Sequence, residues 1–210
     1  MKKTVLLVFL LLLIPISAIT ASIADSSIGF GYYTYRQTLK TGSEPYSWNV
    51  KCMALSASAD ITLFGYNSNH GVDFGFSFLY PLSVKVDGYD VETSPADSEW
   101  GFRLGAAQKY QMREDLTMVT SLGYQFLMNT RKYKDETPVV HSKAIIHGLF
   151  FQGKFIVKLE ESLTISVGGL FIVPWFGSVT YSPEGGDSVR SRYSFRGVII
   201  NPFLGINLQM

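Results

Sequence analysis

The sequence predicts an all-β fold, namely an eight-stranded antiparallel up-and-down transmembrane β-barrel. Three observations lead to this prediction. Large apolar residues alternate with small or polar ones over most of the chain, whereas a helical period is weak. Long polar connections alternate with short ones, as in barrels whose loops share one end and whose turns share the other. Of the 210 residues, 47% are hydrophobic, 14% are aromatic and only 17% are charged, a composition that excludes a disordered chain.

Eight segments of the chain show the strand-type alternation. It is clearest at residues 72–86, where Phe74 and Phe76 share one face while Asp73 and Gly75 lie on the other. The first and seventh segments are less regular, because apolar residues occur on both faces. In chain order the predicted strands lie near residues 28–39, 52–63, 72–86, 100–109, 116–128, 149–159, 163–179 and 198–210.

The connections between these strands alternate in length. A soluble β-sandwich has no physical reason to keep such an order, whereas a membrane barrel has long loops outside and short turns on the inner side. The alternation therefore favours the barrel. The long polar connections are residues 40–47, 87–98, 131–141 and 181–190, and the short ones are 65–71, 112–115 and 160–162.

The beginning of the chain has the features of a cleaved secretory signal peptide, which we assign to residues 1–24. Two lysines precede an apolar run, and the small residues Ser22 and Ala24 stand before the predicted cut. The alternative is a signal anchor that stays as a membrane helix, but the run over 4–19 is shorter than the about 20 residues that a bilayer requires. We therefore expect residues 25–210 to form one outer-membrane β-barrel domain.

Alternation alone does not tell which face of each strand is outside. A soluble lipocalin-like barrel turns its large apolar residues inward, whereas a membrane barrel turns them outward. The second face of these strands is dominated by Gly, Ala, Ser and Thr with scattered charges, which suits the narrow lumen of an eight-stranded barrel. We therefore predict that the large apolar face meets hydrocarbon, with the soluble barrel as the alternative.

Aromatic residues gather toward the ends of the predicted strands. Two girdles of aromatic residues at the membrane interfaces would give this pattern, although aromatic residues also favour strands in general. We prefer the girdles because all three tryptophans fall on the loop side. The loop-side set is Tyr33, Tyr35, Trp48, Trp100, Trp175, Phe176 and Tyr193, and the turn-side set is Phe30, Phe64, Tyr66 and Tyr110.

Charged residues on the inward face form the candidate site. Isolated charges in a narrow lumen would be costly, so we expect them to pair with one another. The lysine Lys85 is also expected inward. These inward charges have two possible interpretations: a salt-bridge plug that closes the barrel, or a narrow polar path for small solutes. We prefer the plug. The candidate lumen network is Asp60, Asp73, Arg103, Lys109, Gln125 and Lys154.

We expect no enzymatic activity, no catalytic residue, no metal site and no cofactor. A lipid-modifying barrel would need a His base beside a Ser nucleophile at the outer rim. His141 and Ser142 are neighbours where a long loop meets a strand, with Glu136 nearby, but adjacent strand residues point to opposite faces. The three histidines are too scattered for a metal cluster, and Cys52 is expected to be a small buried side chain.

The charge balance argues against a nucleic-acid partner. Lys and Arg together number 18 and Asp and Glu number 17, so the chain lacks the basic excess of nucleic-acid-binding proteins. The long loops are the expected contact surface instead, because loops carry recognition on rigid scaffolds. Residues 87–98 are acidic and residues 131–136 are mixed in charge, and neither segment specifies a ligand.

The signal peptide, the eight alternating strands, the loop asymmetry and the alternating final strand resemble the small outer-membrane barrels of outer membrane proteins A, X and W and of the opacity proteins. Members of this group usually end in an aromatic residue, whereas Met210 is last here. The resemblance implies a location in the bacterial outer membrane. It also implies contact with outer-membrane lipid and lipopolysaccharide or an equivalent, and with the barrel-assembly machinery.

The expected function is that of a small integral outer-membrane protein with a structural, surface-contact or host-interaction role. Its extracellular loops would carry that role and would be the place for any extracellular or host ligand. The alternative is a narrow channel or transporter for small or hydrophobic solutes. A path for hydrophobic solutes requires an apolar lumen near the loops, where Leu79, Leu170 and Ile172 are expected to face inward.

Overall fold

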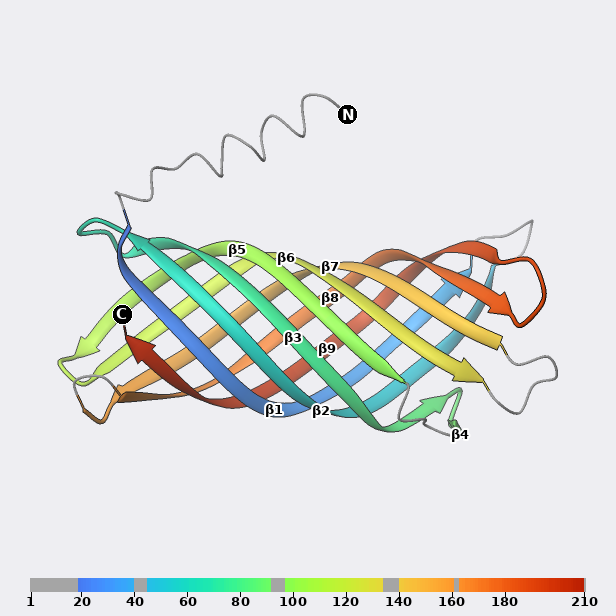
Figure 1. Ribbon diagram of the computed structural model, residues 1–210, viewed down its shortest axis with the longest axis horizontal. Coiled ribbons are helices and arrows are strands. Elements are labelled where there is room, and N and C mark those ends of the chain that lie inside the picture. The colour runs from blue at the N-terminus through green and yellow to red at the C-terminus, as the bar shows by residue number, and fades with distance from the viewer. Residues whose placement is uncertain (1–18, 40–44, 92–96, 134–139, 161–162, 210) are drawn as a thin grey trace, which may run out of the picture.

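The computed structural model describes residues 19–39, 45–91, 97–133, 140–160 and 163–209. This part of the chain is built from strands joined by turns and loops (Figure 1). The strands are β1 (Ile19–Leu39), β2 (Tyr46–Gly65), β3 (His70–Val86), β4 (Tyr89–Val91), β5 (Ser98–Arg113), β6 (Leu116–Tyr133), β7 (Val140–Lys158), β8 (Leu163–Pro183) and β9 (Val189–Gln209).

Eight long strands close into a barrel. All paired strands are antiparallel, β1 lies between β2 and β9, and β2 also pairs with β3, which completes the ring. Closure removes the unpaired strand edges that an open sheet would expose. The prediction of an eight-stranded antiparallel barrel is confirmed, and Figure 1 shows the strands tilted against the long axis, as closure requires.

β4 is a short ninth strand that the sequence analysis did not predict. It pairs with the end of β3, where Val86 lies opposite Tyr89. Asp87 and Gly88 form the turn between them with φ angles of 50° and 91°. Positive φ at both central residues is typical of a type I′ hairpin turn, for which Asp-Gly is a strong signal. The predicted loop 87–98 therefore begins with a hairpin.

The connections of different length lie at opposite ends of the barrel. The short links β2–β3, β5–β6 and β7–β8 share one end with the start of β1 and the end of β9, on the left in Figure 1. The longer links β1–β2, β3–β5, β6–β7 and β8–β9 are at the other end. We call these the turn end and the loop end. The predicted alternation of long and short connections is confirmed.

Along the middle of the barrel the strands turn large apolar side chains to the outside and small or polar ones inward. Ile28 is 70% exposed and Phe102 51%, whereas their inward neighbours Ser27, Gly101 and Arg103 are buried. The predicted assignment of the two faces is therefore confirmed. The inverted arrangement of a soluble barrel is contradicted, because it would bury these large residues inside.

A bulge in β3 corrects one prediction. The register passes over Leu82, so that Met53 of β2 lies opposite Ser83 and Ala54 lies opposite Pro81. One extra residue moves all following side chains to the other face of a strand. The expected inward position of Lys85 is therefore wrong: Lys85 is exposed on the outer wall, and its neighbour Val84 is buried inside.

A second bulge explains the irregular seventh predicted strand. Gly148 of β7 lies opposite Pro174 of β8, but the next residue pair along the ladder is His147 and Phe176. Proline has no N–H to donate to a ladder, and such residues are typical of bulges. Trp175 is the extra residue, and as a result Trp175 and Phe176 both point outward.

The prediction of two aromatic girdles holds for only part of the predicted set. Position near a strand end does not decide which face a residue occupies, because alternate residues point inward. Trp100, Trp175, Phe176, Phe30, Tyr66 and Tyr110 are exposed on the outside. Tyr33, Phe64 and Tyr193 are buried in the lumen, and Tyr35 and Trp48 pack against lumen residues, so for these five the girdle prediction is wrong.

The start of β1 overlaps the segment assigned to the signal peptide. β1 begins at Ile19 and its first residues pair with β2, and Ile23 is buried in a cluster with Phe64. The division into a signal peptide over 1–24 and a barrel over 25–210 stays a prediction. Within the described ranges, none of the segments forms a helix long and apolar enough to cross a membrane.

Candidate functional site

Charged side chains form a layer across the barrel lumen, which we call the charged belt. It consists of Asp25 on β1, Asp60 on β2, Asp73 on β3, Arg103 on β5 and Lys154 on β7, each at most 2% exposed. Strand alternation turns all five inward, and their strands lie around the whole ring. The belt therefore brings three carboxylates and two cations together inside the protein.

One ion pair of the belt crosses the lumen. The Nζ atom of Lys154 lies 3.1 Å from Oδ2 of Asp25, and the hydroxyl of Ser166 donates to the same carboxylate oxygen at 3.0 Å. β1 and β7 are separated by β8 and β9 in the ring, so the lysine reaches the carboxylate through the interior. Such a partner is required, because an unpaired buried charge costs several kcal/mol.

Arg103 joins the other two carboxylates. Its Nε atom lies 3.4 Å from Oδ2 of Asp73, and its Nη2 atom pairs with Oδ2 of Asp60. Asp73 also accepts a hydrogen bond of 2.8 Å from the hydroxyl of Thr62. Asp60 accepts one of 3.3 Å from the side-chain amide of Gln152, again from β7 to β2. The belt thus ties opposite walls of the barrel together.

Glycines on the inward face make room for the belt. A Cβ atom on Gly75 would overlap the guanidinium group of Arg103, and one on Gly101 would overlap the hydroxyl of Ser77. Small inward residues are what the narrow lumen of an eight-stranded barrel requires. At Gly75 the requirement has a specific cause, since the space is occupied by the arginine.

The structure brings five of the six candidate network residues together. Asp60, Asp73, Arg103 and Lys154 belong to the belt, and Gln125 is buried directly opposite Arg103 in the ladder of β5 and β6. Lys109 does not join them. Its Nζ atom lies 4.9 Å from the ring centroid of Phe64, nearer the turn end.

Asp25 is the belt residue that the sequence analysis missed. The predicted first strand begins near Ile28, and Asp25 was assigned to the cleavage position rather than to a strand. In the structure Asp25 lies opposite Asp60 in the ladder of β1 and β2. The small residues Gly29 and Ser27 continue back along the same face to Asp25, so the signal was present in the alternation.

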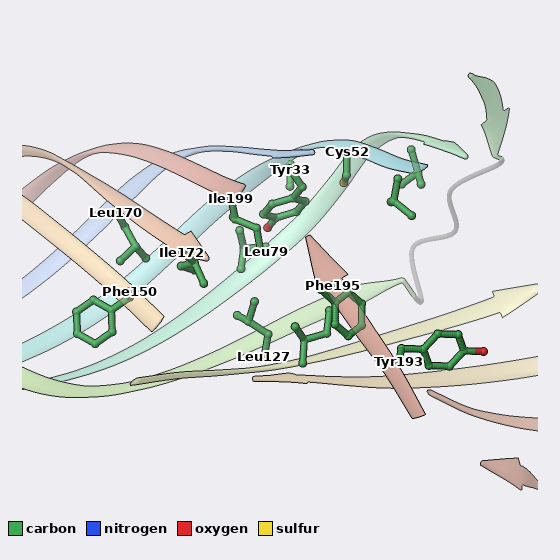
Figure 2. Packing of buried hydrophobic residues seen from close by; sticks show 14 of the residues in the cluster. Tyr33, Cys52, Leu79, Leu127, Phe150, Leu170, Ile172, Tyr193, Phe195 and Ile199 are labelled. Atoms are coloured by element: carbon green, nitrogen blue, oxygen red, sulfur yellow. The ribbon is translucent and has the colours of Figure 1, made fainter. Parts of the chain in front are cut away.

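Apolar side chains fill the lumen on both sides of the belt. The turn-side cluster consists of Ile23, Phe64, Ala107, Val119 and Ile156. The larger loop-side cluster consists of Tyr33, Val50, Cys52, Ala54, Leu79, Val84, Leu127, Ile146, Phe150, Leu170, Ile172, Val179, Tyr193, Phe195, Ile199 and Phe203. Figure 2 shows side chains of this cluster pointing into the interior from different strands. The inward positions predicted for Leu79, Leu170 and Ile172 are confirmed.

The residues considered for catalysis do not assemble. His141 is exposed, with its Nε2 atom 3.5 Å from Oε1 of Glu184, whereas Ser142 is buried on the opposite face. Glu136 lies outside the described residues. In the described part of the chain, no group of three His, Cys, Asp or Glu side chains is arranged to hold a metal ion. Cys52 is buried, as predicted.

Comparisons with known proteins agree on the fold. No family model and no curated protein matches the chain. The crystal structure of the outer membrane protein OprG from Pseudomonas aeruginosa matches with a TM-score of 0.57 and 10% identity, over 92% of this chain and 97% of that one. The outer membrane protein AlkL, in DMPC lipid bilayers, matches with a TM-score of 0.55 and 16% identity, over 91% and 92% of the two chains.

The outer membrane protease OmpT from Escherichia coli also matches, with a TM-score of 0.54 and 9% identity over 90% of this chain and 97% of that one. At such identities the likeness shows the fold alone, and a fold of this kind hosts different functions. The chain therefore has the fold of outer-membrane β-barrel proteins, as the resemblance in sequence implied.

Proposed function

We propose that the chain is an integral protein of the bacterial outer membrane, with a structural or surface-contact role carried by its loop end. The outward apolar wall supports the membrane location, since Phe30 and Leu204 are 60% and 56% exposed. Apolar surface left in water costs about 25 cal/mol per Å². An apolar outer surface that runs around the whole barrel is stable when it is surrounded by the hydrocarbon of a membrane.

The charged belt is the observation that carries the proposed role. At its level Thr62, Asp73 and Ser166 are 0% exposed and Arg103 is 1% exposed, so water has no access there among the described residues. Conducting barrels of this class have a water-filled lumen. A lumen closed by paired charges supports a sealed barrel, and the loop end is then the surface available for contacts, including host contacts.

Planar-bilayer conductance of refolded protein tests the seal. The material must first migrate as a folded band on an unboiled gel, so that a negative result refers to folded barrels. We expect no discrete channel steps. Reproducible steps would overturn the sealed barrel in favour of a narrow polar path, and neutralising Asp60, Arg103 or Lys109 should then change ion selectivity.

A second candidate function, the uptake of small hydrophobic solutes, is favoured by the loop-side cluster. Between the belt and the loops the buried lumen residues of this cluster are apolar, among them Leu79, Leu170 and Ile172. Apolar linings are typical of small-molecule sites. Under this hypothesis a hydrophobic solute would enter the lumen from the loop end and displace side chains of the cluster. The belt would then form the bottom of its binding site.

Tryptophan quenching separates this candidate from the sealed barrel. The chain has three tryptophans; Trp48 packs against the loop-side cluster, whereas Trp100 and Trp175 are exposed outside. In the variant W100F/W175F, a bromoalkane should quench the remaining Trp48 only if it enters the lumen. The control is W48F/W100F, whose Trp175 faces lipid. Quenching of the control alone would reject the uptake function.

We further propose that the protein is not an enzyme and acts without a cofactor. The placement of His141 and Ser142 on opposite faces supports this. Replacing His141 with Ala should leave the acyl pattern of lipid A unchanged, and any change in that pattern would reject the proposal. We also propose that the barrel-assembly machinery inserts the protein into the membrane and that the protein has no nucleic-acid partner.

A further inference from the structure

Basic side chains gather on the outer wall at the loop end. Arg196 on β9, Arg36 on β1, Lys51 on β2 and Lys85 on β3 are exposed and lie on four adjacent strands. We call these four residues the basic arc. Arg192, also on β9, extends it toward the loops.

The basic arc borders the apolar outer wall. On the outward face of β2, Lys51 is followed by Met53 and then by Leu55, which are 54% and 44% exposed. On β1, Tyr32 is 44% exposed and precedes Arg36 on the same face. The arc therefore lies where the apolar band ends, which is the level of lipid headgroups in a barrel of this kind.

The strand register places the cations of the arc against one another. Arg36 lies directly opposite Arg196, and Lys51 lies directly opposite Lys85. Arg36 pairs with Asn49, which makes Arg36 and Lys51 diagonal neighbours on one face. Like charges directly opposite each other destabilise a sheet. This arrangement costs stability unless an anion outside the barrel compensates for it.

The protein compensates for these charges only in part. Asp87 stands near the arc, since its Oδ1 atom accepts a hydrogen bond of 2.7 Å from the backbone N–H of Asn49, the ladder partner of Arg36. Lys85 has an acidic partner, since its Nζ atom lies 3.2 Å from Oδ1 of Asp90. Arg36 donates at 2.8 Å to the neutral hydroxyl of Ser47. In the described part of the chain, no carboxylate pairs with Arg36, Lys51 or Arg196.

We propose that the basic arc binds the phosphate groups of anionic lipids in the outer leaflet, of the lipid A type. Guanidinium groups match phosphate oxygens in geometry and form strong charge-assisted hydrogen bonds with them. The headgroup level is the place where lipid phosphates and these side chains meet. The proposal rests on the membrane location proposed above, and it assigns to named residues the lipid contact that the sequence resemblance only implied.

The test compares two double variants in lipid vesicles. R36Q/R196Q removes the directly opposed pair of the arc, and R113Q/K158Q removes two exposed cations at the turn end. Each protein is refolded into phosphatidylcholine vesicles with and without lipid A, and the urea midpoint is read from the folded band on unboiled gels. A third arm adds inorganic phosphate to the plain vesicles.

Lipid A should raise the urea midpoint of the unaltered protein and of R113Q/K158Q, whereas R36Q/R196Q should lose most of this rise. In plain vesicles R36Q/R196Q should be at least as stable as the unaltered protein, because a like-charge pair has been removed. An equal rise in all three proteins, no rise at all, or the same rise with inorganic phosphate would overturn the proposal.

The outcome is separable from that of the membrane proposal. A protein that does not insert into plain vesicles would contradict the membrane location itself. If R36Q/R196Q fails to fold, the single variant Arg196→Gln replaces it, with Arg113→Gln as its control. The expected results and the results that would overturn the proposal are the same as for the double variants.

Discussion

The belt and the loop-side cluster fill the same lumen from the same strands, but they do so by different physical means. Along β7, Gln152 and Lys154 belong to the level of the belt, while Ile146 and Phe150 belong to the loop-side cluster. In the belt each charged side chain has a partner of opposite charge, because buried charges require one. In the cluster the side chains need only fill the space, and cores tolerate rearrangement if volume is kept. The belt therefore depends on few atoms and the cluster on many.

Removing the cation of the lumen-crossing pair should have the largest effect. Lys154→Met leaves the carboxylate of Asp25 buried without its cation, which typically costs 3–5 kcal/mol, here about 4 kcal/mol. The urea midpoint in phosphatidylcholine vesicles should fall accordingly. The measurement is the loss of the folded band on unboiled gels.

The matched control removes both charges of the same pair. Asp25→Asn combined with Lys154→Met should be more stable than Lys154→Met alone, because no unpaired charge stays buried. If the single variant loses less than about 1 kcal/mol, or if the double variant is no more stable than the single one, the belt does not hold its charges as tightly as the geometry indicates.

Truncating a central residue of the loop-side cluster should cost somewhat less. Leu127 is 1% exposed, and Leu127→Ala should lower the free energy of unfolding by about 3 kcal/mol through lost burial and an incompletely filled cavity. Leu127→Met, which nearly keeps the volume, should cost under about 1.5 kcal/mol. Equal losses in the free energy of unfolding for the two variants would mean that this part of the lumen tolerates substitution no better than the belt does.

Filling the space beside the belt arginine should have a smaller effect. A Cβ on Gly75 overlaps the guanidinium group of Arg103, so Gly75→Ala should cost about 2 kcal/mol through overpacking. The control is Gly153→Ala, whose Cβ would meet only an atom of Phe151 at 4.0 Å. A loss at Gly75 no larger than the loss at Gly153 would show that Arg103 can move aside freely.

The alternation in the sequence was sufficient for the barrel and for most of the belt. Asp60, Asp73, Arg103 and Lys154 sit on faces of small residues, and period two alone turns them inward. The prediction failed where the period was interrupted. The bulges beside Pro81 and Pro174 each shift the phase by one residue, and that shift depends on pairing with the neighbouring strand, which a single strand's pattern does not contain.

Contacts across the lumen could not be predicted from the sequence, for a different reason. The partnership of Lys154 with Asp25 joins residues on strands that are not neighbours in the ring. Alternation gives the face of each residue but not its height in a tilted barrel, which follows from strand stagger. Lys109 was predicted to join the network for the same reason, because the sequence does not give the position of a residue along the barrel axis. In the structure Lys109 lies over the ring of Phe64 instead.

The smallest effect is expected at the lysine that the bulge in β3 turns outward. Lys85 and Asp90 form an ion pair like that of Lys154 and Asp25, but their side chains are 46% and 74% exposed. Exposed pairs contribute about 0–1 kcal/mol, so Lys85→Gln should change the free energy of unfolding by less than about 1 kcal/mol. A loss comparable to that of Lys154→Met would place Lys85 in the lumen, where uninterrupted alternation predicted it, and would remove the bulge. A small loss, measured beside Lys154→Met in the same vesicles, would show that burial and not the ion pair itself gives the belt its strength.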